Sequence, residues 1–169
     1  ESKENSKEII LASQYKEDTF YHVLPQYLYP EVNGGWHQFS PYNELVKKFE
    51  CTDGKTIDES PLYDKNNPYD NRDPRLLYTV MVNHKSFFDG KEFISDPNSN
   101  SADRISKYSQ WSGYCIAKFT DESFSGNLMN YGGNFILIRY PEILLSYLES
   151  KLEAGDVITQ SLLDETINK

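Results

Sequence analysis

The longest helical repeat of apolar residues lies in the last third of the chain, and it limits what the chain can fold into. Pro141 and Glu142 are typical of a helix start, and Gly155 is typical of a helix end. Between them, apolar residues recur at helical spacing, namely Ile143, Leu144, Tyr147, Leu148 and Leu152. The sequence therefore predicts an amphipathic helix over residues 140–153.

A second helix is predicted over residues 159–168, with Thr159 as its N-cap. Its apolar residues at helical spacing are Leu162, Leu163 and Ile167. Two antiparallel helices joined by a short Gly-Asp turn form the unit of tetratricopeptide-like solenoids, and one pair cannot bury both of its faces. We therefore expect the apolar face of this pair to need a covering partner.

Short elements separated by turns are predicted for most of residues 9–135. They are a largely buried strand at 9–12, a helix at 41–50 with Ser40 as its N-cap, strands at 76–82 and 114–119, and a shorter extended segment at 93–94. Turns are expected at 52–55 and 89–90, and an exposed loop is expected at 96–103.

The segment from Lys16 to Phe39 shows no helical period and contains Pro and Gly among many aromatic residues. It is predicted to be one long irregular loop. Loops of this length are usually functional or disordered, and the aromatic content argues against disorder. The segment is therefore a candidate for a binding surface.

The net charge of the chain excludes some partners. With 26 acidic and 17 basic residues, the formal charge is −9, which repels nucleic acids and anionic membrane surfaces but not neutral ligands. Apolar runs such as residues 136–138 are far too short to span a bilayer. We expect any signal peptide or anchor to lie upstream of residue 1.

Cys51 and Cys115 leave two states open, a disulfide or buried free thiols.

Several separate segments together resemble one protein family. The most specific are the Asn-Arg-Asp-Pro-Arg run at 71–75 and the Arg-Tyr-Pro-Glu run at 139–142. The others are Gly34-Gly35-Trp36, residues 41–46 with Phe49 and Glu50, residues 52–55, Asn67-Pro68-Tyr69-Asp70, Gly113-Tyr114, Lys118-Phe119, Ile138 and residues 143–145. In this order and spacing they resemble the SusD/RagB proteins, the outer-membrane nutrient-binding lipoproteins of glycan-utilisation systems in Gram-negative bacteria. The resemblance extends from about Ile9 onward.

The resemblance implies a fold class that is mainly α. It implies a tetratricopeptide-like α-α superhelix as scaffold, with an irregular, loop-rich portion that contains short helices and short β-strands. Because family members are much longer, residues 1–169 would be a single C-terminal-side fragment of a SusD/RagB-like domain. Within it, residues 9–135 would be the irregular portion and residues 136–169 the last helix pair.

The resemblance also implies a function and a location. The protein would bind oligosaccharides at the cell surface without catalysis and deliver them to a TonB-dependent outer-membrane transporter. It would be a lipoprotein of the outer membrane, held there only by a lipid anchor outside this fragment. Two alternatives stay open: a scaffold and transporter-docking portion that does not touch sugar, or a glycoside hydrolase, although no pair of carboxylates is marked for that chemistry.

Aromatic residues supply the candidates for sugar contact, because the apolar C–H faces of pyranose rings stack on aromatic planes. Trp36 is the first candidate, with Tyr27, Tyr29 and His37 on the same segment. Trp111 is the second. The alternative is that the Gly-Gly-Trp motif serves packing and that its indole is buried.

The other polar motifs are interpreted as structural. The Asp and Arg residues of segment 70–75 are expected to exchange hydrogen bonds that fix a loop to the following strand. Segment 64–75 resembles the start of a calcium loop but has Pro and Tyr where a ligand and glycine are required. His22, His37 and His84 are too scattered to indicate a metal site. The sequence therefore predicts no metal, no cofactor and no enzymatic activity.

Overall fold

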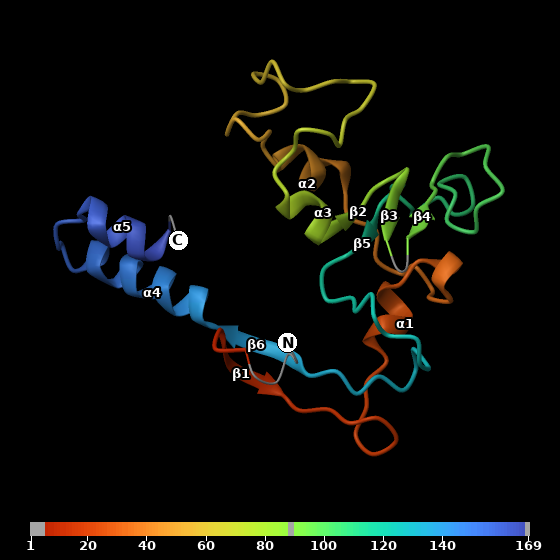
Figure 1. The fold of residues 1–169 in the computed structure, drawn as a ribbon, viewed down its shortest axis with the longest axis horizontal. Helices are drawn as coiled ribbons and strands as arrows, with labels where there is room; N and C mark the ends of the chain where they lie inside the picture. The colour runs from red at the N-terminus through yellow and green to blue at the C-terminus, as the bar shows by residue number, and fades with distance from the viewer. Residues whose placement is uncertain (1–5, 88–89, 168–169) are drawn as a thin grey trace. The chain divides into compact units, whose positions relative to one another are not determined.

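The structure, a computed structural model, describes residues 6–87 and 90–167 (Figure 1). The chain divides into two compact units. The terminal unit combines residues 1–22 with residues 132–169, and the central unit consists of residues 23–131. Within the described residues, no helix is long and apolar enough to cross a bilayer.

The terminal unit contains a two-stranded ribbon made from distant parts of the chain. Strand β1 (Ile9–Ser13) pairs antiparallel with β6 (Phe135–Arg139), and the first residue of β1 lies opposite the last residue of β6. The predicted strand at 9–12 is confirmed, but its predicted burial is wrong, because Ile10 and Leu11 are 52% and 48% exposed. A ribbon of two strands shields little apolar surface, since its faces need a further layer to cover them.

The two predicted helices follow this ribbon. Helix α4 (Tyr140–Glu153) continues directly from β6, and α5 (Gln160–Thr166) returns beside it (Figure 1). Gly155 has a φ of 79° after the end of α4, a conformation that favours glycine. The Thr159 hydroxyl accepts the N–H of Leu162 at 3.2 Å, as an N-cap does. Both helices are thus confirmed, although the last two residues of the chain lie outside the described part.

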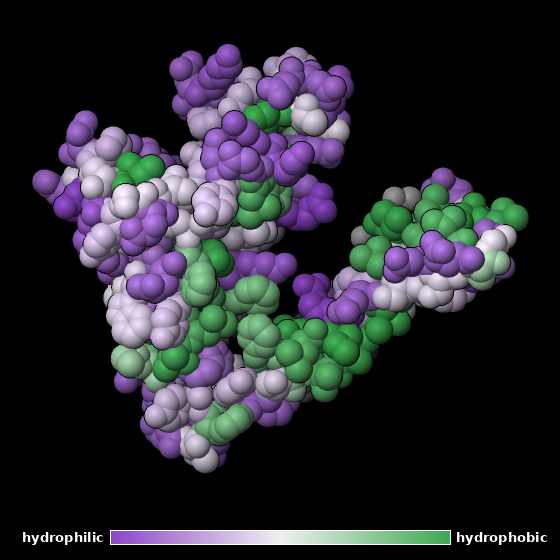
Figure 2. Space-filling model, turned by 180° about the vertical axis from the view of Figure 1, so that it is seen from behind, coloured by the Kyte–Doolittle hydropathy of each residue, from purple (hydrophilic) through white to green (hydrophobic). Residues whose placement is uncertain are grey.

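Much apolar surface remains uncovered on the terminal unit. Leu144 and Leu148 of α4 are half-buried, whereas Leu145 and Leu152, one seven-residue repeat apart, are exposed. Figure 2 shows apolar residues gathered over both the ribbon and the helix pair. The helix pair therefore presents an apolar face, as its isolated repeat predicts.

We expect the purified chain to self-associate through this apolar face, because large exposed apolar patches promote association. Light scattering coupled to size-exclusion chromatography should show a mass above that of one chain, rising with concentration. Leu152→Glu should lower this mass, and Ser146→Glu, which adds the same charge at an exposed polar position of α4, should not. A monomer at every concentration would contradict the prediction.

The central unit consists of short helices and strands. In chain order they are α1 (Leu24–Leu28), the 3₁₀ helix η2 (Glu31–Asn33), α2 (Asn43–Lys48), α3 (Arg75–Thr79), β2 (Val80–Met81), β3 (Lys85–Phe87), β4 (Lys91–Phe93) and β5 (Cys115–Ile116). Strand β2 pairs antiparallel with β5, and β3 pairs antiparallel with β4.

Two hydrophobic clusters form the core of the central unit, and the segment around β2 contributes to both. The first cluster contains Leu28, Tyr29, Met81, Phe87, Phe93 and Cys115. The second contains Val46, Leu76, Val80 and Val82. Successive residues of an extended chain point to opposite sides, so the alternation at 80–82 places this segment between the two clusters.

The strand predicted at 76–82 is wrong over its first half, because residues 75–79 form α3 and only β2 is extended. The Asp73 carboxylate accepts the N–H of Arg75 at 2.8 Å and satisfies a donor at the start of the helix. The Arg75 guanidinium also donates to the Asp73 carboxylate, so the Asp–Arg exchange predicted for this motif occurs here. These local bonds and the burial of Leu76 outweigh the β propensity of the segment.

Two other predictions are corrected. The segment 16–39 is not one irregular loop, since it contains α1 and η2, and Pro25 occupies a first-turn position of α1 that proline suits. The helix predicted at 41–50 is shorter, because α2 begins after Tyr42 rather than after Ser40 and has no side-chain N-cap bond.

The remaining short elements agree in part with those predicted from the sequence. The strand predicted at 114–119 is reduced to β5, and the extended segment at 93–94 overlaps the end of β4. The turn at 52–55 is confirmed, with Gly54 at a φ of 74°. Of the turn predicted at 89–90, residue 89 lies outside the described residues.

Arg72 is buried and binds three backbone carbonyls. Its guanidinium donates to the oxygens of Val46 and Phe49, near the C-terminal end of α2, at 2.7 Å each. It also donates to the oxygen of Pro68 at 2.9 Å. One cation thus joins the polar loop before α3 to the end of α2, where helix carbonyls lack partners of their own.

The two cysteines are both buried and free, so the structure shows thiols and no disulfide. Cys115 donates its S–H to the carbonyl oxygen of Leu28 at 3.1 Å. Burial raises the pKa of the Cys115 thiol well above its ordinary value. A thiol held neutral in this way acts as a small apolar side chain of the core.

Candidate ligand-binding cleft

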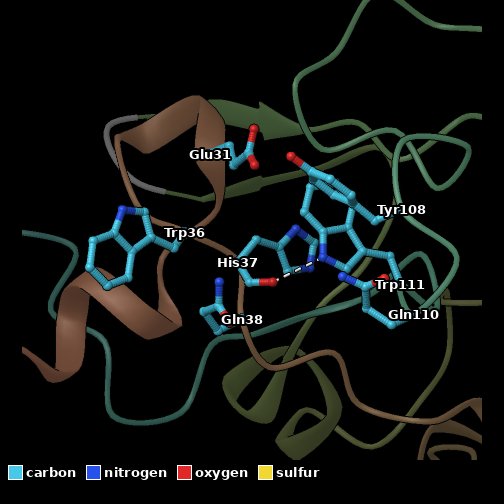
Figure 3. Close-up of a pocket in the computed structure, with 7 residues that line it drawn as sticks. All are labelled: Glu31, Trp36, His37, Gln38, Tyr108, Gln110 and Trp111. Atoms are coloured by element: carbon cyan, nitrogen blue, oxygen red, sulfur yellow. Dashed lines mark hydrogen bonds between the residues drawn. The ribbon is translucent and has the colours of Figure 1, made fainter.

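A cleft of about 490 Å³ lies in the central unit, between residues 31–38 and residues 108–111 (Figure 3). Its lining residues are Glu31, Trp36, His37, Gln38, Tyr108, Gln110 and Trp111. Figure 3 shows Trp36 on one side, Tyr108 and Trp111 on the other, and His37 between them. The cleft therefore brings together two aromatic segments that lie far apart in the sequence.

Gly35 lets the first wall of the cleft pack closely against α1. A Cβ at this position would lie 2.1 Å from the carbonyl oxygen of Tyr29, so a larger residue does not fit without a backbone shift. The N–H groups of Trp36 and His37 then donate to the carbonyls of Gln26 and Tyr29, at 2.7 and 3.0 Å. This backbone pairing leaves the indole of Trp36 at the surface, 42% exposed.

Asp103 is the buried centre of the cleft floor. Its carboxylate accepts the backbone N–H groups of Glu31 and Val32 at 2.8 and 2.9 Å, and it lies 2.8 Å from His37 Nδ1. The side chain is fully buried, so the exposed loop predicted at 96–103 is wrong at its last residue. The correction has a physical reason, because these three donors replace the water that a carboxylate otherwise needs.

His37 connects Asp103 to the second wall of the cleft. Its ring stacks on the ring of Trp111, with centroids 4.2 Å apart and planes 22° apart. The Trp111 Nε1–H donates to the carbonyl oxygen of His37 at 3.0 Å. Trp111 is consequently fixed by both the side chain and the backbone of His37, and only 7% of it is exposed.

Ser40, His37 and Asp103 lie in the order found in serine hydrolases, but their hydrogen bonds do not allow that chemistry. Ser40 Oγ lies 3.2 Å from His37 Nε2, and the carbonyl oxygen of Tyr114 lies closer, at 2.9 Å. A carbonyl oxygen can only accept, so the shorter contact assigns the Nε2 hydrogen to Tyr114 and leaves no lone pair on Nε2 to accept a proton from Ser40. The cluster positions the cleft and does not activate a nucleophile.

An ion pair borders the aromatic wall. The ammonium of Lys107 pairs with the carboxylate of Glu31. It also lies 5.3 Å from the ring centre of Tyr108 and 5.8 Å from that of Trp111, within the range of cation–π attraction. The two rings meet edge to face, with centroids 4.8 Å apart. Two exposed amide side chains complete the lining, so the cleft combines flat apolar surfaces with groups that form hydrogen bonds.

The five residues predicted from the sequence to contact sugar lie in different environments in the structure. Three of them line the cleft, and Tyr27 supports one of these by meeting Trp36 edge to face at 5.0 Å. Tyr29 belongs to the core, because its ring is buried and its hydroxyl donates to the Asp121 carbonyl at 2.7 Å. Burial raises the pKa of Tyr29 to about 12. The ring of His37 is also buried, and Trp111 is only 7% exposed, so Trp36, at 42%, has the most exposed ring of the five.

Sequence reasoning missed much of the cleft. The missed lining residues are Glu31, Gln38, Tyr108 and Gln110, and Asp103 and Lys107 support them. The only signal for the lining residues is their nearness in the sequence to Trp36 and Trp111. Asp103 carries no signal, because nothing local distinguishes it among 26 acidic residues.

Histidine and acidic side chains do not gather into a metal centre in the part of the chain that the structure describes. His84 contacts two carboxylates, but through different nitrogens, Glu92 at Nδ1 (2.7 Å) and Asp96 at Nε2 (2.8 Å). The hydrogen bond to Glu92 is the largest cause that raises the pKa of His84 above 6.5. These three residues thus form an exposed ion-pair bridge rather than a chelating group.

Comparison with known proteins identifies the family. The model of the SusD family matches residues 7–169. The crystal structure of a SusD-like carbohydrate binding protein from Bacteroides fragilis NCTC 9343 is 36% identical, with a TM-score of 0.85, and the match covers 96% of this chain and 33% of that chain. A SusD-like protein from the same organism is 24% identical, with a TM-score of 0.63, over 92% of this chain and 34% of its own. No curated protein matches.

The present chain spans about a third of the length of both solved proteins. Over that span the fold agrees closely with the first of them, and the family model covers nearly every residue. The resemblance carried by the Asn-Arg-Asp-Pro-Arg and Arg-Tyr-Pro-Glu runs is therefore confirmed, and the chain belongs to the SusD family.

Proposed function

We propose that the chain is part of a non-catalytic protein that binds oligosaccharides at the cell surface, and that the cleft beside Trp36 contacts the sugar. The observation that carries this proposal is the cleft itself, where an exposed indole lies across from the Tyr108 and Trp111 rings. The relative with 36% identity is a SusD-like carbohydrate binding protein, which agrees with this use of the cleft.

The lining suits sugar rings for two reasons. The C–H faces of a pyranose are apolar and pack against aromatic planes, of which the cleft has several. Its hydroxyl groups need donors and acceptors, which Glu31, Gln38 and Gln110 supply. The volume of about 490 Å³ also lies within the range of small-molecule sites, roughly 300–1,000 Å³.

Binding without chemistry is favoured by the state of the acidic and basic groups. Glycoside hydrolysis needs two carboxylates on either side of the scissile bond. Among the lining residues only Glu31 has a carboxylate, and Lys107 already pairs with it. The Asp103 carboxylate is buried and holds three donors. His37 is fully buried and both of its ring nitrogens already have partners, so it is not placed as a general base in the cleft.

We further propose that the whole protein is an outer-membrane surface lipoprotein that delivers the sugar to a TonB-dependent transporter. Membership of the SusD family supports this proposal. The antiparallel α4 and α5, joined by a short turn, support a tetratricopeptide-like scaffold. The alternative, a scaffold and transporter-docking portion without sugar contacts, predicts that changes in the cleft do not alter sugar binding.

Trp36→Ala is expected to weaken oligosaccharide binding by about fivefold or more, because stacking on a ring of this size contributes on the order of 1 kcal/mol beyond area burial. The melting temperature should hardly change, since a surface substitution costs less than about 0.5 kcal/mol of stability. Isothermal titration calorimetry with an oligosaccharide selected on a glycan array measures the first effect, and calorimetric melting measures the second.

Tyr78→Ala is the matched control, because this ring is 78% exposed in the same unit and does not line the cleft. It should leave both affinity and melting temperature unchanged. Equal affinity losses in the two variants, or a melting temperature several degrees lower in Trp36→Ala, would show that Trp36 serves packing and that sugar binds elsewhere.

A further inference from the structure

A fixed pair of opposite charges borders the cleft beside its aromatic wall, formed by Glu31, which lines the cleft, and Lys107. The side chains of Lys107 and Glu31 that form this pair are only 26% and 22% exposed, so water and salt screen it incompletely. The backbone N–H of Glu31 is bound to the buried Asp103, and the Lys107 ammonium lies near the rings of Tyr108 and Trp111. The pair is therefore fixed beside the aromatic wall of the cleft.

This pair makes an acidic sugar unfavourable. A uronic acid carries a carboxylate where a neutral hexose has its C6 hydroxymethyl group, and that carboxylate needs a cation or other donors in place of its water. The nearest cation is Lys107, which Glu31 already occupies. A uronate that took over Lys107 would leave the partly buried Glu31 carboxylate without its partner.

The other charges around the cleft do not favour an anion either. The ring of His37 is fully buried against Asp103, so it is not available to pair with an anion. The net charge of −9 repels anionic ligands at longer range. A neutral sugar meets neither penalty, and its hydroxyls can donate to the Glu31 carboxylate and accept from the Lys107 ammonium.

We infer that the Glu31–Lys107 pair makes this cleft select neutral oligosaccharides over acidic ones. The inference rests on the proposed function and adds a substrate class to it. Glu31 excludes anionic sugars, and Lys107 holds the Glu31 carboxylate in place against the aromatic wall. Removal of the Glu31 charge leaves an uncompensated ammonium at the same place, which attracts a uronate.

Matched pairs of oligosaccharides test the inference. Each neutral member, such as cellohexaose, maltohexaose or mannohexaose, is paired with a counterpart whose C6 hydroxymethyl groups are oxidised to carboxylates. We expect the unmodified chain to prefer the neutral member of a bound pair by about tenfold or more at low salt. Glu31→Gln should reduce that preference by about tenfold and should still bind the neutral member.

Asp70→Asn is the matched control. It makes the same change in net charge, but it removes the acidic partner of Lys85 from an exposed pair (2.7 Å) that does not line the cleft. Its preference should equal that of the unmodified chain. The melting curve of Asp70→Asn should match that of the unmodified chain. Glu31→Gln should melt somewhat lower, because it leaves the partly buried Lys107 ammonium without its partner.

The possible outcomes separate this inference from the proposed function. If the unmodified chain binds acidic members as tightly as neutral ones, the inference is wrong and the proposed function stands. If it prefers neutral members but Glu31→Gln and Asp70→Asn behave alike, the ion pair does not set the preference, and the inference is again wrong. If no member of any pair binds, both the proposed function and the inference are overturned.

Discussion

Replacing Asp103 with alanine is expected to lower the free energy of unfolding by about 3–5 kcal/mol, because each buried polar group left without its partner costs roughly 1–3 kcal/mol. The variant leaves His37 Nδ1 and the N–H groups of Glu31 and Val32 without the carboxylate that they contact. All three donors are tied to the cleft, so oligosaccharide binding should fall with stability. The stability of Asp103→Asn should lie between those of the unmodified chain and Asp103→Ala, because its amide presents an N–H toward donors that need an acceptor.

Urea unfolding followed by tryptophan fluorescence measures this loss, since Trp111 stacks on the His37 ring and reports on its position. Asp58→Ala serves as the control, because Asp58 is an exposed carboxylate in the same unit. If Asp103→Ala unfolds at the same urea concentration as Asp58→Ala, Asp103 does not hold the cleft floor together.

Arg72→Met is expected to be the second most damaging change, with a loss of about 2–4 kcal/mol in the free energy of unfolding. Methionine fills much of the same volume but leaves the carbonyls of Val46, Phe49 and Pro68 without their shared donor. Arg72→Lys should recover part of the loss, since one ammonium cannot reproduce the planar geometry of the guanidinium. Each kcal/mol corresponds to roughly 2–4 °C in melting temperature for a chain of this size.

Arg75→Met is the matched control for Arg72→Met. It removes the same residue type from the same motif, at a site where the side chain is 79% exposed. The Asp73–Arg75 pair is an exposed one, and such pairs contribute little to stability. The two variants should therefore differ clearly in differential scanning calorimetry. Similar melting temperatures for both would contradict the structural role assigned to the buried guanidinium.

The helix pair could be predicted from the sequence because its signals are local. Pro141, Gly155 and Thr159 each mark a helix end within a few residues, and the apolar repeat between them fixes the face. The segment 76–82 could not be predicted in the same way. Its composition favours a strand, whereas its conformation depends on the Asp73 carboxylate and on burial in a cluster formed by other segments.

The cleft was only partly predictable. The Gly-Gly-Trp motif indicates a close backbone approach that leaves a ring at the surface, and Trp36 could be predicted as that ring. Four aromatic or imidazole side chains lie between residues 27 and 37, and composition does not reveal which of them face inward. Asp103 is 66 positions from His37 in the sequence, so only the folded chain shows that the two residues form one unit.

The β1–β6 ribbon has a consequence for the order in which the chain folds. Its strands are separated by the whole central unit, and the neighbouring bond from Tyr15 N–H to Asn134 Oδ1 spans 119 positions. The contacts that define residues 23–131 lie within that stretch, so these residues can fold without β6. Until β6 pairs with it, β1 has unpaired backbone groups and exposed apolar side chains, a state that favours pairing with other chains. Ribbon closure is therefore expected to be the slow and aggregation-sensitive step in the folding of this chain.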